Sequence, residues 1–222
     1  MKTSVRSSAH LHSDDLLTPL EHLHGRLPQL QVADIALIHH KKDFTRFLLR
    51  KITESYWDHT AMIVYTKNPE KGFTHDIIEE SIQFGFRNSL RRGVELHRLD
   101  KYLSRPDLYD VGIKRCDALD DATRERARSF MIMNVDAPYY RLPTADFFFA
   151  WFSKRIRAYV LARQRFSCSG LIQKAYYEAS DWKTRAHLVF RQWGGTPIEL
   201  QELTTPADIA KSENCRWVWN KR

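Results

Sequence analysis

Glycine is scarce in this chain. Only eight of its 222 residues are Gly, and none of them belongs to a Gly-rich phosphate-binding motif. Such a motif is needed where backbone N–H groups must approach a nucleotide phosphate closely. Nucleotide-dependent chemistry is therefore not expected, and we predict no cofactor.

Cysteine is rarer still. The three cysteines, Cys116, Cys168 and Cys215, lie far apart and form no Cys-x-x-Cys pair. This spacing favours neither a zinc ribbon nor a disulfide framework, and we predict no metal site. An odd count that includes one candidate nucleophile is typical of a protein from a reducing compartment.

Long apolar runs are missing as well. The uninterrupted apolar stretches fall far short of the ~20 residues that a membrane-spanning helix needs. Residues 1–6 do not lead into the apolar core of a secretory signal, so a cytoplasmic location is expected. Residues 1–30 are predicted to be a polar leader that need not be ordered, and residues 31–222 to be one folded domain.

The chain is basic and rich in aromatic side chains. Its formal net charge is +8, and 43% of its residues are hydrophobic, which is enough for one core. The charge makes an anionic surface a candidate partner. A specific nucleic-acid function is not expected, because there is no recognition helix, zinc finger or aromatic RNA motif. The oligomeric state cannot be read from the sequence.

The candidate nucleophile is Cys168, in the run Phe166–Gly170. The N–H groups at a helix N-terminus stabilise a thiolate, and small neighbours allow a substrate carbonyl to approach. Apolar residues follow Cys168 with helical spacing, which predicts that this cysteine begins a half-buried helix: Leu171, Ile172, Ala175 and Tyr176.

A histidine and a carboxylate precede Cys168 in strand-like runs. His59 opens an apolar run that is typical of a strand covered on both faces. Glu79 and Glu80 lie in a second such run, where a buried carboxylate needs a partner. An imidazole is a suitable one, because a carboxylate fixes its tautomer and stabilises its cation. Alone, each residue is more often structural; together with Cys168 they indicate nucleophilic catalysis.

Five segments occur in an order that is more specific than any one of them. They are Val32–Ile38, Trp57–Val64, Ile78–Phe86, Phe166–Ile172 and Thr205–Ser212. In this order they resemble the circularly permuted, papain-like cysteine amidase/hydrolase family of the YiiX/YaeF type. That family is related to the NlpC-type cell-wall peptidases and to lecithin–retinol acyltransferase. The resemblance extends over about residues 30–220, in scattered blocks.

The resemblance implies an α+β fold, specifically a circularly permuted papain-like one. In such a fold an antiparallel sheet packs against helices that include the nucleophile helix. It also implies a Cys168–His59–Glu80 triad that cleaves a peptide-like amide or an acyl bond through a thioester. Glu80 is preferred to Glu79 because the family's acid precedes a small residue, here Ser81. Alternation along the strand does not decide between the two.

Two positions depart from the family pattern. Ala33 stands where Gly is usual, and Asp58 stands where Ser or Thr usually precedes the histidine. A carboxylate is a poor oxyanion donor, so only the N–H of Cys168 can be assigned to that role. Asp58 is nevertheless near the expected site, and we predict that it contacts substrate together with Trp57 and Ser169.

Aromatic and basic residues are mixed in segment 143–165, directly before Cys168. Such a pattern most often means an ordinary amphipathic helix. The functional alternative is a surface that grips an acyl chain or lies on an anionic membrane, with Phe148 and Trp151 touching substrate. Peptide-like and lipid-like acyl substrates both stay open.

Two other functions compete with the amidase prediction. One is a lipid acyltransferase or thioesterase of the lecithin–retinol acyltransferase type. The other is a catalytically inactive basic binding module that keeps the fold, for which Ala33 and Asp58 are suitable departures. An intact set of Cys168, His59 and Glu80 argues against this second alternative.

The apolar periodicity also predicts the secondary structure. Strands are expected at 34–39, 58–66, 76–82, 84–89, 108–114 and 215–219. Helices are expected at 42–54, 119–133, 144–163 and 168–180.

Overall fold

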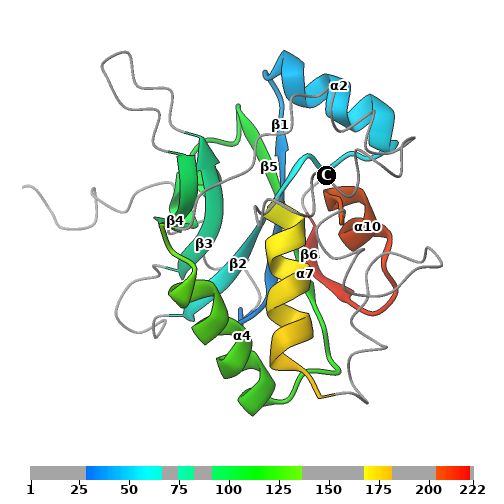
Figure 1. Ribbon diagram of the computed structural model, residues 1–222. Coiled ribbons are helices and arrows are strands. Elements are labelled where there is room, and N and C mark those ends of the chain that lie inside the picture. The colour runs from blue at the N-terminus through cyan, green and yellow to red at the C-terminus, as the bar shows by residue number, and fades with distance from the viewer. Residues whose placement is uncertain (1–28, 67–74, 83–91, 137–167, 182–203, 221–222) are drawn as a thin grey trace, which may run out of the picture.

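A six-stranded sheet forms the centre of the molecule (Figure 1). The computed structural model describes residues 29–66, 75–82, 92–136, 168–181 and 204–220. The strands are β1 (Ile35–His40), β2 (His59–Thr66), β3 (His75–Ile82), β4 (Arg92–Arg98), β5 (Tyr109–Arg115) and β6 (Arg216–Asn220). Their order across the sheet is β4-β3-β2-β1-β5-β6, and every neighbouring pair is antiparallel.

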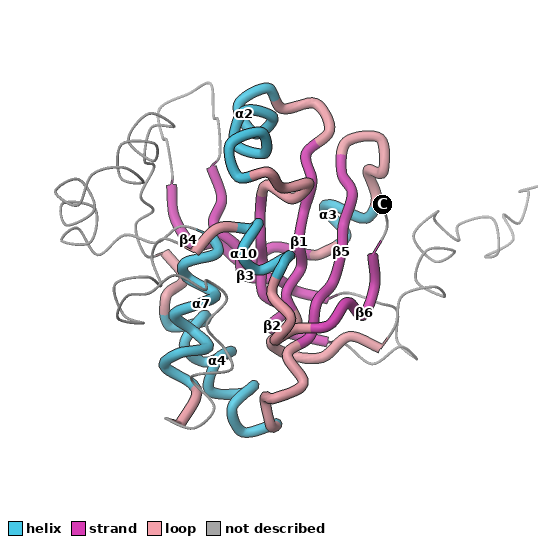
Figure 2. Tube along the Cα trace, turned by 90° about the vertical axis from the view of Figure 1, so that its right-hand side faces the viewer, coloured by secondary structure: helices cyan, strands magenta, loops and turns pink. Residues whose placement is uncertain are grey.

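Helices cover both faces of this sheet. The described ones are α2 (Phe44–Thr53), α3 (Asp100–Leu103), α4 (Asp121–Met133), α7 (Cys168–Ala179) and α10 (Pro206–Lys211). Figure 2 shows α4 and α7 side by side along one face, where they bury Leu37 and Met62. The opposite face, with Ile38 and Ala61, packs against α3. The α+β prediction is confirmed.

Capping residues explain where several helices begin. Asp43 and Asp120 each precede a helix and accept a hydrogen bond from the backbone N–H three residues further on. Helix α10 begins with a capping box, in which Thr205 and Asp208 exchange hydrogen bonds, and Pro206 takes the first helical position. These caps satisfy N–H groups that have no partner inside a helix.

A buried ion pair secures the start of β1. Asp34 accepts two hydrogen bonds from Arg115, at 2.8 and 2.7 Å, and lies 3.8 Å from Arg124. Its neighbour Ala33 has a φ of 64°, in the left-handed region that favours glycine. Glycine adopts this conformation with less strain than alanine does.

A buried lysine fastens α10 to the sheet. The ammonium of Lys114 in β5 donates to the carbonyls of Ile209, Ala210 and Ser212, at 3.0, 2.9 and 2.6 Å. These carbonyls lie at the C-terminal end of α10, where helices lack internal donors. The position of α10 therefore depends on a side chain from the sheet interior.

Two of the three cysteines form a disulfide. Cys116 follows β5 directly, Cys215 precedes β6 directly, and the bond between them is buried. The expectation that the chain has no disulfide is therefore wrong. Sequence spacing could not reveal the pair, because 99 positions separate two residues that β5 and β6 bring together.

Most predicted elements occur within two residues of their expected bounds. Strand β4 and helices α3 and α10 were not predicted, and the predicted strand 84–89 and helix 144–163 lie outside the described residues. Of the predicted leader, only Gln29 and Leu30 are described, and Leu30 is buried in the core; the boundary at residue 31 stays a prediction. No helix in the described segments is long and apolar enough to span a membrane.

Candidate functional site

Cys168 is the first residue of α7, and its side chain is partly exposed. Contacts along the helix fix its position. The Ser169 hydroxyl donates to the carbonyl of Thr204 at 2.7 Å, and the Tyr176 hydroxyl donates to the carbonyl of Ala33. Helix α7 is thus tied both to the segment before α10 and to the start of β1, which places the thiol at the end of the sheet where β2 begins.

The thiol of Cys168 meets His59 and Thr60 at that end of β2. Burial raises the pKa of the thiol, but the hydrogen bond and charge of His59 and a backbone hydrogen bond from Thr60 outweigh this and lower it to about 7. The pairing of β2 with β3 begins at Ala61, so His59 and Thr60 lie just before the part of β2 that pairs with β3. A lowered pKa increases the thiolate fraction at neutral pH, and the thiolate is the form that a cysteine nucleophile requires.

His59 is buried and lies among other ring systems. Its ring centroid is 6.0 Å from that of His40 and 6.5 Å from that of Tyr102. By strand alternation His59 shares the face of Ala61, which packs towards α3. Its position at the first residue of β2 lets it also reach Cys168, which begins a helix on the other face.

The register of β3 separates the two candidate acids. Glu79 pairs with Ala61 of β2, whereas Glu80 pairs with Val94 of β4, a residue of the core beneath α4 and α7. Residues paired across strands share a face, so Glu79 occupies the face of His59 and Glu80 the opposite one. The choice of Glu80 stays a prediction, and the register argues for Glu79.

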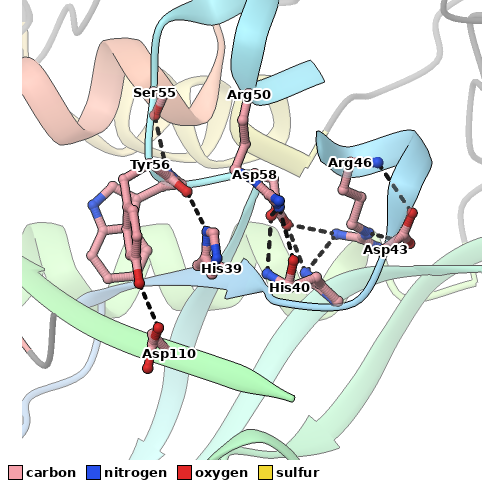
Figure 3. A network of polar contacts seen from close by, with 10 residues as sticks. His39, His40, Asp43, Arg46, Arg50, Ser55, Tyr56, Asp58 and Asp110 are labelled. Atoms are coloured by element: carbon pink, nitrogen blue, oxygen red, sulfur yellow. Dashed lines mark hydrogen bonds and ion pairs between the residues drawn. The ribbon is translucent and has the colours of Figure 1, made fainter. Parts of the chain in front are cut away.

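A polar cluster surrounds Asp58, directly before His59 (Figure 3). The Asp58 carboxylate is fully buried and accepts hydrogen bonds from the backbone N–H and the Nδ1 of His40, at 2.9 and 2.6 Å. Arg50 donates to the same carboxylate and to the carbonyl of His40. Arg46 approaches it at 3.3 Å. The end of β1, the start of β2 and helix α2 are joined at this one carboxylate.

The cluster shifts the titration of its members. Burial raises the pKa of Asp58, but hydrogen bonds and charge from His40 and the charge of Arg46 outweigh it and lower the pKa to about 2. Burial also lowers the pKa of His40 to about 4, with the charge of Arg46 acting in the same direction against the hydrogen bond from Asp58. His40 is therefore neutral at pH 7, and the 2.6 Å contact with Asp58 requires its proton on Nδ1.

Arg46 extends this cluster towards the nucleophile. Burial lowers the pKa of its guanidinium, but the charges of Asp58, Tyr102 and Cys168 outweigh that effect and raise it. The guanidinium is thus within electrostatic reach of the thiol. It carries a fixed positive charge to the end of the sheet where Cys168 lies.

The residues predicted to bind substrate differ in their burial and in their contacts. Asp58 lies beside His59 but is engaged entirely by His40, Arg46 and Arg50. Trp57 is 1% exposed and packs against Trp217, and Ser169 is likewise buried. Both residues therefore belong to the packing around the site. That both contact substrate stays a prediction. Phe148 and Trp151 lie outside the described residues.

Sequence reasoning missed three residues of the site: His40, Arg46 and Arg50. A signal for the arginines did exist, because positions four apart in the predicted helix 42–54 lie on one helix face. His40 gave no such signal, since its importance arises only when the end of β1 meets Asp58. Among the described residues, no cluster of three or more His, Cys, Asp or Glu is placed to hold a metal ion.

Comparison of the chain with protein-family models and with curated proteins found no match.

Proposed function

We propose that this protein is a cysteine hydrolase with a circularly permuted papain-like fold, which cleaves an amide or acyl bond through a thioester. One observation carries the proposal: a partly exposed cysteine at a helix N-terminus meets a buried histidine at a strand start, and its pKa is lowered to about 7. The order of histidine before cysteine along the chain agrees with the permuted arrangement.

The reaction follows from these roles. His59 accepts the proton of the Cys168 thiol, and the thiolate attacks the substrate carbonyl carbon. The tetrahedral oxyanion accepts a hydrogen bond from the backbone N–H of Cys168. Its collapse breaks the bond to the leaving group, which takes the proton from His59, and leaves a thioester. Water then attacks the thioester with His59 as base, which releases the acid and restores the thiol.

A carboxylate on β3 would orient His59 and stabilise its cation. We predict that Glu79→Gln slows iodoacetamide labelling of Cys168 at pH 6 by about tenfold, because an opposite charge nearby is worth a pKa unit or more to a histidine. Glu80→Gln is the matched control, and it is expected to change the rate little. The opposite ranking would restore the sequence-based choice of Glu80.

For the substrate we propose the same two classes, in the same order, as the sequence suggests. A peptide-like amide comes first and a lipid-like acyl group second, while the aromatic segment that bears on this choice lies outside the described residues. The inactive binding module is the less favoured alternative, since a module without chemistry has no use for a thiol of lowered pKa.

Alkylation of the native protein tests the proposal before any substrate is known. We expect iodoacetamide to label Cys168 with a midpoint near pH 7, whereas an ordinary thiol titrates near ~8.5. At pH 6 the larger thiolate fraction, offset partly by lower nucleophilicity, should make Cys168 react about fivefold faster than an unperturbed thiol. Mass spectrometry of peptides identifies the labelled residue.

Two variants complete this test. His59→Ala should move the labelling midpoint up towards that of an ordinary thiol, and Cys168→Ser should abolish labelling of the native protein. A wild-type midpoint at or above ~8.5 would contradict the hydrolase and move the binding module to first place.

A further inference from the structure

We propose that Arg46 binds a negatively charged group of the substrate, a carboxylate or a phosphate, close to the carbonyl that Cys168 attacks. The inference rests on the proposed function and narrows its substrate to an anionic acyl compound. It would make Arg46 a residue that determines specificity.

Contacts between neighbouring side chains connect Arg46 to the nucleophile. Its Nη1 lies 3.2 Å from Nδ1 of His40, and the rings of His40 and His59 are 6.0 Å apart. His59 in turn is hydrogen-bonded to Cys168. Helix α2 thus delivers a cation to the end of the sheet where α7 begins (Figure 1).

Asp58 does not need Arg46 to be satisfied. Its carboxylate already accepts two hydrogen bonds from His40 and one from Arg50, which is 11% exposed and also holds the carbonyl of His40. Arg46 is more exposed, at 27%, and its contacts with Asp58 and Asp43 are both 3.3 Å long. Of this arginine pair, Arg50 is the structural member.

The same geometry leaves donors on Arg46 for a ligand. Nη1 faces Asp58 and Nε faces Asp43, while Nη2 meets no acceptor in the segments that the structure describes. A guanidinium held at two nitrogens presents a pre-oriented edge, which suits the planar oxygens of a carboxylate or the oxygens of a phosphate. The net charge of +8 would favour the approach of such a substrate.

A pair of matched reagents tests this proposal. Iodoacetate and iodoacetamide deliver the same electrophilic carbon, but only iodoacetate is anionic. For the full-length protein, the ratio of their rate constants at Cys168, divided by the same ratio for N-acetylcysteine, measures the preference of the site for an anion. We expect this normalised ratio to exceed unity for the wild-type protein and to be about tenfold lower for Arg46→Gln. The difference between the two proteins should shrink in high salt.

Two controls separate the charge of Arg46 from its structural contacts. Arg46→Lys keeps the charge and should retain most of the preference, which also covers the case in which Arg46→Gln folds poorly. Arg216→Gln removes an exposed arginine that is also ion-paired with an aspartate, Asp117, and should leave the ratio unchanged. A ratio that is the same in wild type and Arg46→Gln would overturn the proposal.

The readouts of the two proposals are independent. The pH midpoint of labelling with iodoacetamide alone reports the thiolate. A midpoint like that of an ordinary thiol, together with a reagent ratio that depends on Arg46, would overturn the hydrolase but not the anion site. A lowered midpoint with the same reagent ratio in wild type and Arg46→Gln would overturn the anion site but not the hydrolase. Protection of Cys168 from iodoacetamide by acetate or by inorganic phosphate, lost in Arg46→Gln, would show which anionic group is preferred; protection equal in both proteins would count against the site.

Discussion

Removal of the Cys116–Cys215 disulfide is expected to lower the free energy of unfolding by about 4–5 kcal/mol, most of the stability of a marginal domain. The bond spans 99 positions, and closing so long a loop removes much conformational entropy from the unfolded chain. Both cysteines are buried in the same core cluster as Met131 and Ile209, so the folded state gains little freedom when the bond is cut.

Urea unfolding with and without reductant measures this effect, and Cys116→Ala/Cys215→Ala reports it without reductant. Cys168→Ala is the control, because reductant should destabilise it as much as wild type. Thiol titration in denaturant should find one free thiol before reduction and three after it. Three thiols before reduction would contradict the prediction.

The disulfide also bears on where the protein resides. The cytoplasmic location was expected because no secretory signal was recognised, and the odd number of cysteines agreed with a reducing compartment. With Cys116 and Cys215 paired, the odd count reduces to one candidate nucleophile plus one structural bond. Structural disulfides persist in oxidising compartments, so the titration above tests the location as well as the stability.

Acidification from pH 6.5 to pH 4 is expected to cost about 3 kcal/mol of stability through His40 alone. Burial lowers the pKa of His40 from its ordinary 6.5 to about 4. Between these two pH values His40 is protonated in the unfolded chain but not in the folded protein, so stability falls as the pH falls. Above pH 6.5 both states hold His40 neutral, and this penalty disappears.

Urea unfolding at pH 7 and pH 4 compares wild type with His40→Asn, in which the amide can still donate to Asp58. The variant should lose about 3 kcal/mol less than wild type over this range. His97→Asn controls for the loss of a histidine as such, since His97 lies on β4 and pairs with Glu95. Equal losses in wild type and His40→Asn would contradict the assignment.

The sequence predicts regular structure well where a segment is decided by its own pattern. Strand β2 and helix α7 follow from apolar periodicity and begin within a residue of their expected starts. The proximity of Cys168 to His59 was implied by the family resemblance and does not follow from the periodicity of these two elements. Helix α10 was missed because six residues are too few for a periodic pattern, although its capping box was present in the sequence.

What the sequence could not predict depends on closure of the fold. Asp58 looked like a departure from a family pattern when it was considered alone. In the structure it is compensated by His40, Arg46 and Arg50, which come from two other elements. The choice between Glu79 and Glu80 likewise depends on register, which is fixed by the pairing of β3 with β2 and β4 and not by neighbours in the chain.

The attachment of α10 has a consequence for synthesis of the protein. Ser169 beside the nucleophile is anchored on Thr204, α10 is held by Lys114, and Cys215 joins the sheet through Cys116. All of these contacts need residues 204–220, more than thirty positions after Cys168. In a nascent chain these contacts can therefore form only after residues 204–220 have also been synthesised, well after Cys168 and His59.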